Sequence, residues 1–248
     1  MEAAGHEPLS KSRAGKLNRQ MHEEPEKFDQ DGIEDLLGLY DGEIRFADHE
    51  IGRLLDGFEA AGALEDTAVF LTADHGESFG EHDRFGHHSY PYEEIIRVPL
   101  ITSTPADTGN TVDDQVSLID LGPTIYDLTG IEMPEAVQGR SLLSLMQGGE
   151  REETVHITTS KQGQIVSTRT SVWKCIWELD GDTVKLFDLE NDPEELTDVS
   201  ESNPETVGRF HEIVEEYLEK CDRTDVELQD VDHSMEAEER LRDLGYLE

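Results

Sequence analysis

A group of acidic and imidazole side chains follows an apolar run that ends at residue 72. Asp74 and His75 come directly after this run, Gly76 allows the chain to turn, and His87 and His88 follow in the same loop. The run is rich in β-forming residues, which is typical of a fully buried strand of a parallel sheet. In open α/β sheets, ligands bind beyond the carboxyl ends of the strands. We therefore expect this loop to hold a metal ion or an oxyanion.

The pair Asp74 and His75 has the chemistry of a metal site. Asp74 supplies a hard anionic oxygen and His75 a borderline nitrogen. A carboxylate combined with an imidazole suits Ca²⁺, Mg²⁺ or Mn²⁺ better than structural Zn²⁺. The alternative interpretation is that Asp74 caps a helix beginning near Glu77, with His75 on the surface. The local pattern leaves both interpretations open.

The histidines of the loop are candidates for contact with an anion. His87 and His88 follow Gly86, and either one can donate a hydrogen bond to an anionic substrate or protonate a leaving group. His82 has the same chemistry, although a lone histidine is more often structural. Arg97 precedes an apolar strand, where we expect it to pair with a carboxylate rather than to touch substrate.

The charge of the chain excludes some classes of function. Its 58 acidic residues against 20 Lys and Arg give a net charge of -38. Binding to nucleic acid or to anionic membranes requires clustered cations, so neither partner is expected. The acids are spread along the whole chain, which indicates a solvated surface suited to high salt. No stretch is apolar for long enough to cross a bilayer, and residues 1–6 lack the apolar region of a signal peptide, which favours a cytoplasmic protein.

The hydrophobic pattern changes near residue 150. Before it, helices alternate with strands, which predicts an α/β domain over residues 1–150. After it, β-prone runs follow one another without helices, which predicts a second subdomain over residues 151–248 with an antiparallel sheet. The turn 180–182 is a strong hairpin signal.

The elements expected in the first domain begin with a loop and irregular helix over residues 1–30. The elements that follow are a helix at 33–61, strands at 67–72 and 97–102, and helices at 120–128 and 142–146. Asp120 is expected to be the N-cap of the helix at 120–128. The second subdomain is expected to contain strands at 155–159, 165–170, 172–179 and 184–189, and helices at 204–220 and 235–247.

Several segments closely resemble the sulfatase family of the alkaline phosphatase superfamily. The strongest are residues 72–82, which read TADHGESFGEH, and residues 92–101, which read YEEIIRVPLI. The resemblance extends from about residue 31 to the end of the chain. The other similar segments are 39–48, 120–124, 139–142, 186–195 and 240–247.

The resemblance implies a fold and a set of roles. The family fold is an alkaline-phosphatase-like α/β sandwich followed by a small antiparallel β-sheet subdomain with a packed helix, and this chain would supply its C-terminal part. Asp74 and His75 correspond to the second pair of metal ligands, and His87 to a lysine that contacts the sulfate. The implied cofactor is a divalent metal, with Ca²⁺ favoured over Mn²⁺ or Mg²⁺. The implied substrates are small-molecule sulfate esters or sulfated glycans.

The chain departs from the family at its beginning. Family members carry an early Asp-Asp pair and a Cys or Ser followed by x-Pro-x-Arg, whose Cys or Ser becomes a formylglycine nucleophile. Neither Cys175 nor Cys221 has that context. The chain therefore resembles the C-terminal half of a sulfuric ester hydrolase, and we expect it to be inactive without the missing N-terminal half. The alternatives are a phosphodiesterase or phosphonate hydrolase of the same superfamily and a non-catalytic truncated fragment.

The acidic surface makes a testable prediction, because it marks the chain as an acidic member of the haloarchaeal type. Carboxylates that repel one another destabilise the folded chain at low ionic strength, and added salt shortens the screening length from about 10 Å at 0.1 M to about 3 Å at 1 M. We expect the melting temperature, followed by circular dichroism, to rise as KCl is raised from roughly 0.1 M to multimolar concentration. A melting temperature that stays constant over this range contradicts the prediction.

Overall fold

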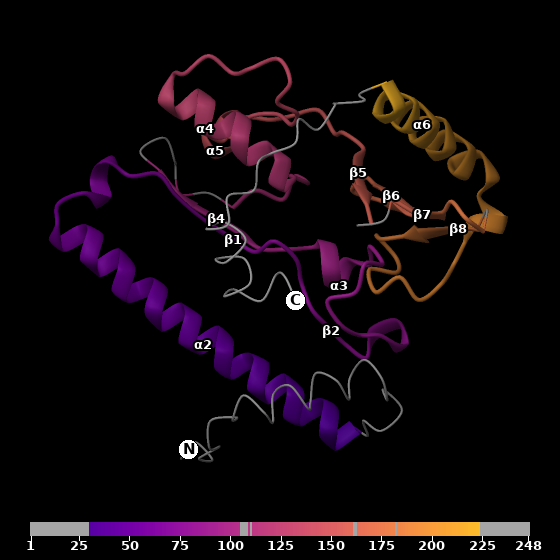
Figure 1. Cartoon of the computed structure of the whole chain (residues 1–248), viewed down its shortest axis with the longest axis horizontal. Helices are drawn as coiled ribbons and strands as arrows, with labels where there is room; N and C mark the ends of the chain where they lie inside the picture. The colour runs from indigo at the N-terminus through magenta and orange to yellow at the C-terminus, as the bar shows by residue number, and fades with distance from the viewer. Residues whose placement is uncertain (1–29, 105–108, 110, 161–162, 182, 224–248) are drawn as a thin grey trace, which may run out of the picture. The chain divides into compact units, whose positions relative to one another are not determined.

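The computed structural model describes residues 30–104, 109, 111–160, 163–181 and 183–223. The expected irregular segment at the N-terminus and the expected helix at 235–247 lie outside these residues. The internal contacts divide the chain into two units, residues 1–207 and 208–248, and each is described by itself. The order of the elements is shown in Figure 1.

The long N-terminal helix is confirmed. Helix α2 (Gln30–Ala60) is followed by Gly62 with φ +67°, the left-handed conformation that commonly ends a helix. Its first half packs through Leu36, which is buried, and Tyr40, whose ring lies edge-on 5.0 Å from the ring of Phe79. Farther along, Leu54 is 61% exposed, so the apolar stripe of the helix is only partly covered. The 3-10 helix η2 (Leu64–Asp66) then leads into the first strand.

The expected parallel, fully buried strand is wrong in both respects. Strand β1 (Val69–Thr72) pairs antiparallel with β4 (Leu100–Ser103), and its side chains are half-buried. The intervening segment contains a hairpin, β2 (Ser78–Phe79) with β3 (Phe85–Gly86), whose connection includes the 3-10 helix η3 (Glu81–Asp83), and then the short helix α3 (Glu93–Ile96). Without a crossover helix the chain returns in the opposite direction. A run of apolar residues does not encode strand direction, so the pattern could not distinguish these cases.

The sheet of β1 and β4 is covered on one side by two helices. Helix α4 (Leu121–Thr129) follows the 3-10 helix η4 (Leu118–Asp120), and α5 (Leu143–Met146) comes after a loop. The buried side chains of α5 and Leu142 pack against Phe70 of β1 and Leu100 of β4. The opposite face stays open, because Ile101 of β4 is 60% exposed.

Asp120 occupies the N-cap position of α4, as expected, but its side chain makes no cap hydrogen bond to that helix. Instead the buried carboxylate accepts hydrogen bonds from the backbone N–H groups of Ser117 (3.1 Å) and Arg140 (2.9 Å) and from the guanidinium of Arg151 (3.0 Å). Asp120 thus connects the start of η4 with the segments that contain Arg140 and Arg151. The sequence near the helix start could not predict these partners, because they lie 20 and 31 residues farther along the chain.

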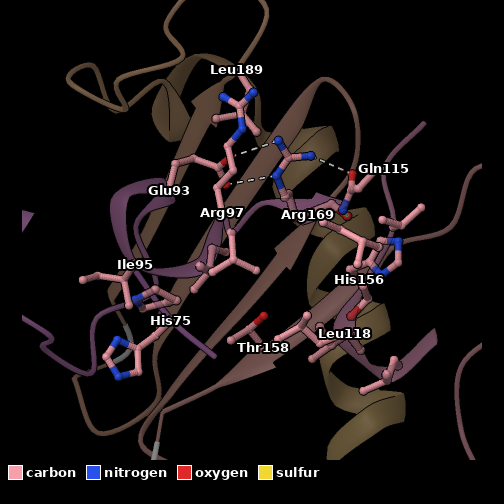
Figure 2. Close-up of a pocket in the computed structure, with 18 of the residues that line it drawn as sticks. His75, Glu93, Ile95, Arg97, Gln115, Leu118, His156, Thr158, Arg169 and Leu189 are labelled. Atoms are coloured by element: carbon pink, nitrogen blue, oxygen red, sulfur yellow. Dashed lines mark hydrogen bonds and ion pairs between the residues drawn. The ribbon is translucent and has the colours of Figure 1, made fainter. Parts of the chain in front are cut away.

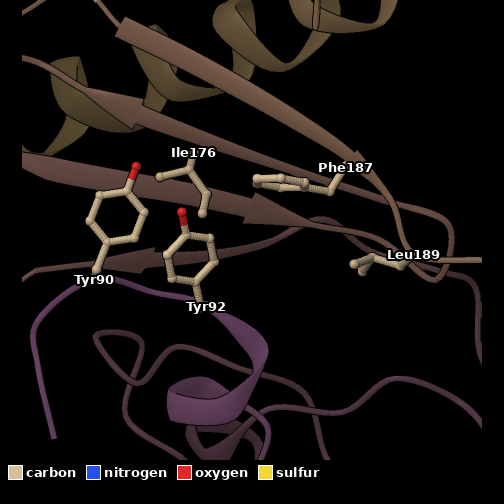
Figure 3. Packing of buried hydrophobic residues seen from close by; sticks show 5 residues of the cluster. All are labelled: Tyr90, Tyr92, Ile176, Phe187 and Leu189. Atoms are coloured by element: carbon tan, nitrogen blue, oxygen red, sulfur yellow. The ribbon is translucent and has the colours of Figure 1, made fainter. Parts of the chain in front are cut away.

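The expected antiparallel sheet is confirmed. Its strands run in sequence order, and each pairs antiparallel with the next. Two tyrosines that precede α3, Tyr90 and Tyr92, pack in one buried cluster with Ile176 and Phe187 of this sheet and with Leu189 (Figure 3). The histidine-rich loop is therefore attached to the four-stranded sheet. The strands are β5 (His156–Thr159), β6 (Ile165–Arg169), β7 (Trp173–Glu178) and β8 (Thr183–Asp188).

Buried ion pairs reinforce this attachment. Glu93 of α3 accepts from Arg169 of β6 at 3.0 Å on both carboxylate oxygens, and one of these oxygens lies 3.2 Å from Nζ of Lys174. Lys174 of β7 is fully buried and also lies 2.8 Å from a carboxylate oxygen of Glu195. The other oxygen of Glu195 accepts the backbone N–H of Glu93 at 2.6 Å. Hydrogen bonding to Arg169 and the charge of Lys174 hold the pKa of Glu93 below its usual value, although burial acts in the opposite direction.

The final described helix, α6 (Pro204–Arg223), follows the 3-10 helix η5 (Ser200–Ser202). Its apolar stripe is confirmed, since Phe210 and Val214 are buried. Among the described residues, no helix combines the length and the apolar character needed to cross a membrane.

Lys174 tests the role of the buried ion pairs. We expect Lys174→Met to lower the free energy of unfolding by about 3–5 kcal/mol, because it leaves the buried carboxylates of Glu93 and Glu195 without their shared cation. The exposed pair of Lys220 with Glu216 offers a matched control. Lys220→Met should change the same quantity by less than about 1 kcal/mol. Urea denaturation at constant KCl measures both, and equal effects of the two variants would contradict a role for the buried pairs.

Candidate active site

The loop after β1 is held at both of its ends by short contacts with the segment around α3. The hydroxyl of Thr72 donates to the carbonyl of Pro99 at 2.7 Å, and the backbone N–H of Gly76 donates to the carbonyl of Ile95 at 2.7 Å. A Cβ atom at position 76 would collide with the carbonyl oxygen of Glu94, so only glycine fits there. The close approach of two backbones therefore fixes where Asp74 and His75 lie.

Asp74 and His75 are placed together and face solvent. One oxygen of Asp74 accepts the backbone N–H of His75 at 3.0 Å, and the other lies 3.8 Å from Nε2 of His75. Nδ1 of the same imidazole lies 2.8 Å from the carbonyl of Gly76. Because a carbonyl only accepts, Nδ1 carries the proton in the neutral ring and Nε2 keeps its lone pair. Metal-binding histidines typically donate their second N–H in this way.

The ring of His87 lies beside the imidazole of His75. The two rings stack with centroids 4.9 Å apart and planes at 28°. Nδ1 of His87 lies 3.6 Å from a carboxylate oxygen of Glu77, and the His87 side chain is 62% exposed. The structure therefore brings together three of the predicted site residues, Asp74, His75 and His87, within one loop.

His88 differs from His87 in its hydrogen bonding and in its burial. Its Nδ1 accepts the backbone N–H of Tyr90 at 3.3 Å, which leaves the proton on Nε2. Nε2 is buried and has no hydrogen-bond partner in the described part of the chain. Burial and then the charge of Arg84 lower the pKa of His88. His88 is therefore a neutral hydrogen-bond donor rather than an acid.

His82 is structural rather than part of the site. Its ring stacks on Tyr92 with centroids 3.6 Å apart and nearly parallel planes. Nδ1 lies 2.9 Å from a carboxylate oxygen of Glu94, and Nε2 lies 3.1 Å from the carbonyl of Glu195. The two nitrogens thus join the loop to α3 and to the segment after β8.

A cleft of about 920 Å³ extends from Asp74 and His75 toward the four-stranded sheet (Figure 2). It is large enough for a sugar-sized ligand. His88 and Arg97 line it, as do three residues that the sequence analysis did not consider: Gln115, His156 and Arg169. These three come from distant parts of the chain, and no local motif marks them. Burial lowers the pKa of His156, which favours a neutral ring in the cleft.

The residues present fit a divalent cation only in part. In the described part of the chain, no group of three or more His, Cys, Asp or Glu side chains is arranged to hold a metal ion. Asp74 and His75 nevertheless offer one carboxylate oxygen and one unprotonated imidazole nitrogen on the same side of the loop. This donor set suits a hard or borderline divalent cation that receives further ligands from elsewhere.

Comparisons with known proteins agree on one family. The family model described as Sulfatase matches residues 4–131, and the model described as N-sulphoglucosamine sulphohydrolase, C-terminal, matches residues 80–223. Arylsulfatase K of Xenopus laevis is 32% identical over 196 residues, covering 73% of this chain and 36% of that protein. An arylsulfatase of Clostridium perfringens is 31% identical over 194 residues, covering 73% of this chain and 39% of that protein. The chain thus spans little more than a third of the length of these relatives.

Solved structures show the same fold. A putative sulfatase from Bacteroides thetaiotaomicron superposes with a TM-score of 0.72 at 20% identity, covering 83% of this chain and 46% of that one. A complex of BT4656 with its substrate D-glucosamine-2-N,6-O-disulfate gives 0.59 at 26% identity, with coverages of 74% and 40%. Phosphonate monoester hydrolase of Agrobacterium radiobacter gives 0.65 at 23% identity, with coverages of 79% and 43%. The family matches and this shared fold lead to one conclusion: the chain belongs to the sulfatase family.

Proposed function

We propose that this chain is the C-terminal part of a metal-dependent hydrolase of sulfate monoesters. The observation that carries the proposal is the arrangement of Asp74 and His75, in which a carboxylate oxygen and an imidazole nitrogen with its lone pair free lie side by side at the end of β1. When bound, the cation would offset the negative charge of the sulfate oxygens and of the attacking nucleophile. Ca²⁺ is the favoured ion, with Mn²⁺ and Mg²⁺ as the other candidates.

The two neighbouring histidines have separate roles in this proposal. His87 is exposed beside His75 and would contact the sulfate or protonate the leaving oxygen. His88 would contact the substrate from the wall of the cleft, and its ring would have to turn to do so, because its unpartnered Nε2–H is buried in this structure. The substrate would be a small sulfate ester or a sulfated glycan, as for the disulfated glucosamine bound by BT4656.

The rest of the catalytic machinery would come from outside the described residues. Two observations support this part of the proposal. Asp74 is 91% exposed, although a carboxylate in a working metal site is normally enclosed. Apolar side chains on α2 and on β4, such as Leu54 and Ile101, are largely exposed as well. Exposed apolar surface of this kind usually marks an interface.

We also propose that the protein works at high salt concentration. The net charge of -38 supports this proposal, because such a surface needs screening to remain folded.

Cation binding can be tested without any catalytic activity. Mn²⁺ broadens NMR signals of nuclei close to it, so we expect it to broaden the imidazole signals of His75 and His87 first. The imidazole of His49 on α2 serves as the internal reference, because it is an exposed histidine that also lies beside a carboxylate, that of Glu50 at 4.0 Å. In Asp74→Asn, we expect Mn²⁺ to broaden the signals of His75 and His87 no earlier than that of His49. In the wild-type chain, we expect added Ca²⁺ to displace Mn²⁺ and so to restore the His75 signal.

A matched variant controls for binding of Mn²⁺ to the many surface acids. Asp48→Asn removes one acid from the exposed side of α2 and should leave the selective broadening unchanged. Broadening of His49 at the same Mn²⁺ concentration as His75, or retention of the selectivity in Asp74→Asn, would count against the metal site.

The isolated 248-residue chain should not hydrolyse aryl sulfates, because it contains no residue in the context of the family nucleophile. The assay compares p-nitrophenyl sulfate with the corresponding phosphate diester and phosphonate ester. Sulfatase turnover by the purified chain would refute the dependence on a missing half. Turnover of only the phosphorus esters would favour the phosphonate hydrolase alternative. If a fragment carrying the nucleophile motif copurifies and restores activity, the ester that it hydrolyses fixes the reaction class.

A further inference from the structure

Arg97 is exposed and lines the cleft, and its guanidinium has no partner among the described residues. In the described part of the chain, its side chain makes no hydrogen bond or ion pair, so the carboxylate pairing expected from the sequence is wrong for these residues. Arg45 on α2 likewise has no acidic partner among the described residues, but it does not line the cleft. Figure 2 shows the guanidinium beside Leu189, well away from His75.

The other arginine of the cleft is already occupied. Arg169 donates to both carboxylate oxygens of Glu93 and also to Gln115 at 2.7 Å. Its charge is therefore balanced, and its donors are directed at protein acceptors (Figure 2). The histidines His88 and His156 have lowered pKa values because of burial. Arg97 is thus the cation of the cleft that is free to meet a ligand.

The remaining charges of the cleft are acidic, so an anion would be attracted only in the immediate neighbourhood of the Arg97 guanidinium. Asp74, Asp113 and Asp114 line the same cleft. A diffuse positive field is therefore absent, and an anion would be held only where it meets the planar guanidinium directly. A guanidinium binds carboxylate or sulfate oxygens through two parallel hydrogen bonds, which gives geometric selectivity.

We propose that Arg97 binds an anionic substituent of the substrate, a second sulfate or a carboxylate, that is distinct from the sulfate ester to be hydrolysed. This inference rests on the proposed function, because it takes the ester to lie at Asp74, His75 and His87. His87 is not among the residues that line the cleft, whereas Arg97 is. The two anionic groups would therefore occupy separate ends of one ligand. The substrate class becomes a sugar that carries at least two negative groups.

The experiment compares matched ligands on the 248-residue chain by ligand-observed NMR titration. The first pair is D-glucosamine-2-N,6-O-disulfate and N-acetylglucosamine 6-sulfate, in which a neutral acetyl group replaces the N-sulfate. The second pair is glucuronic acid 2-sulfate and glucose 2-sulfate, which differ by a carboxylate. We expect the doubly charged member of at least one pair to bind about tenfold more tightly, as is typical of one charge-assisted contact. The pair that shows the preference identifies the substituent as sulfate or carboxylate.

Variants then assign the preference to Arg97. Arg97→Gln should abolish the preference while leaving the affinity for the singly charged ligand nearly unchanged, and Arg97→Lys should restore part of it. Arg45→Gln, an exposed arginine on α2, should leave the preference intact and controls for the loss of one positive charge. Equal affinity of the wild-type chain for both members of each pair, including no measurable affinity, would overturn the proposal. So would a preference that persists in Arg97→Gln.

His87 separates this proposal from the proposed function. If the sulfatase assignment is correct, His87→Ala weakens all sulfated ligands alike and leaves the preference for a second anion in place. If His87→Ala has no effect on any ligand while Arg97→Gln abolishes the preference, the anion site at Arg97 stands and the assignment of the ester site is wrong.

Discussion

The ion pairs around Lys174 determine where the candidate site can lie. Glu93 begins the short helix α3, and its carboxylate reaches Arg169 and Lys174 on two neighbouring strands of the C-terminal sheet. Glu195 also holds the start of α3, because its carboxylate pairs with Lys174 and accepts the backbone N–H of Glu93. Breaking a buried pair is costly, so α3 cannot move freely against the sheet. Since Gly76 is hydrogen-bonded to Ile95, the loop with Asp74 and His75 inherits this rigidity.

Much of the fold could be predicted from periodicity and from turn residues. Helix α2, the four-stranded sheet and the stripe on α6 follow patterns that depend only on neighbouring residues. The direction of β1 and the partners of Asp120 depend on residues far along the chain. An apolar run fits a strand of either direction, and an acid near a helix start fits both a cap and a buried anchor. These were the points at which the sequence interpretation was wrong.

The candidate site shows the same division. The chemical type of Asp74, His75 and His87 was readable because all three lie in one loop, and the structure brings them together. His82 has the same residue type but is fully used in holding Tyr92 and Glu94, which no spacing rule reveals. Gln115, His156 and Arg169 enter the cleft from other segments, so only the folded chain identifies them.

An acidic protein that binds an anion must overcome its own surface charge. A net charge of -38 repels an approaching sulfate ester over the screening length, which is about 10 Å at 0.1 M salt and about 3 Å at 1 M. High salt weakens this repulsion, but it also weakens attraction at exposed cations. The attraction of an exposed cation such as Arg97 is screened at high salt, whereas a hydrogen bond from a neutral donor such as the imidazole of His88 does not depend on net charge. Under the proposed function, the recognition of anions therefore has to rely on short, directional hydrogen bonds, such as the two parallel ones that a guanidinium can form.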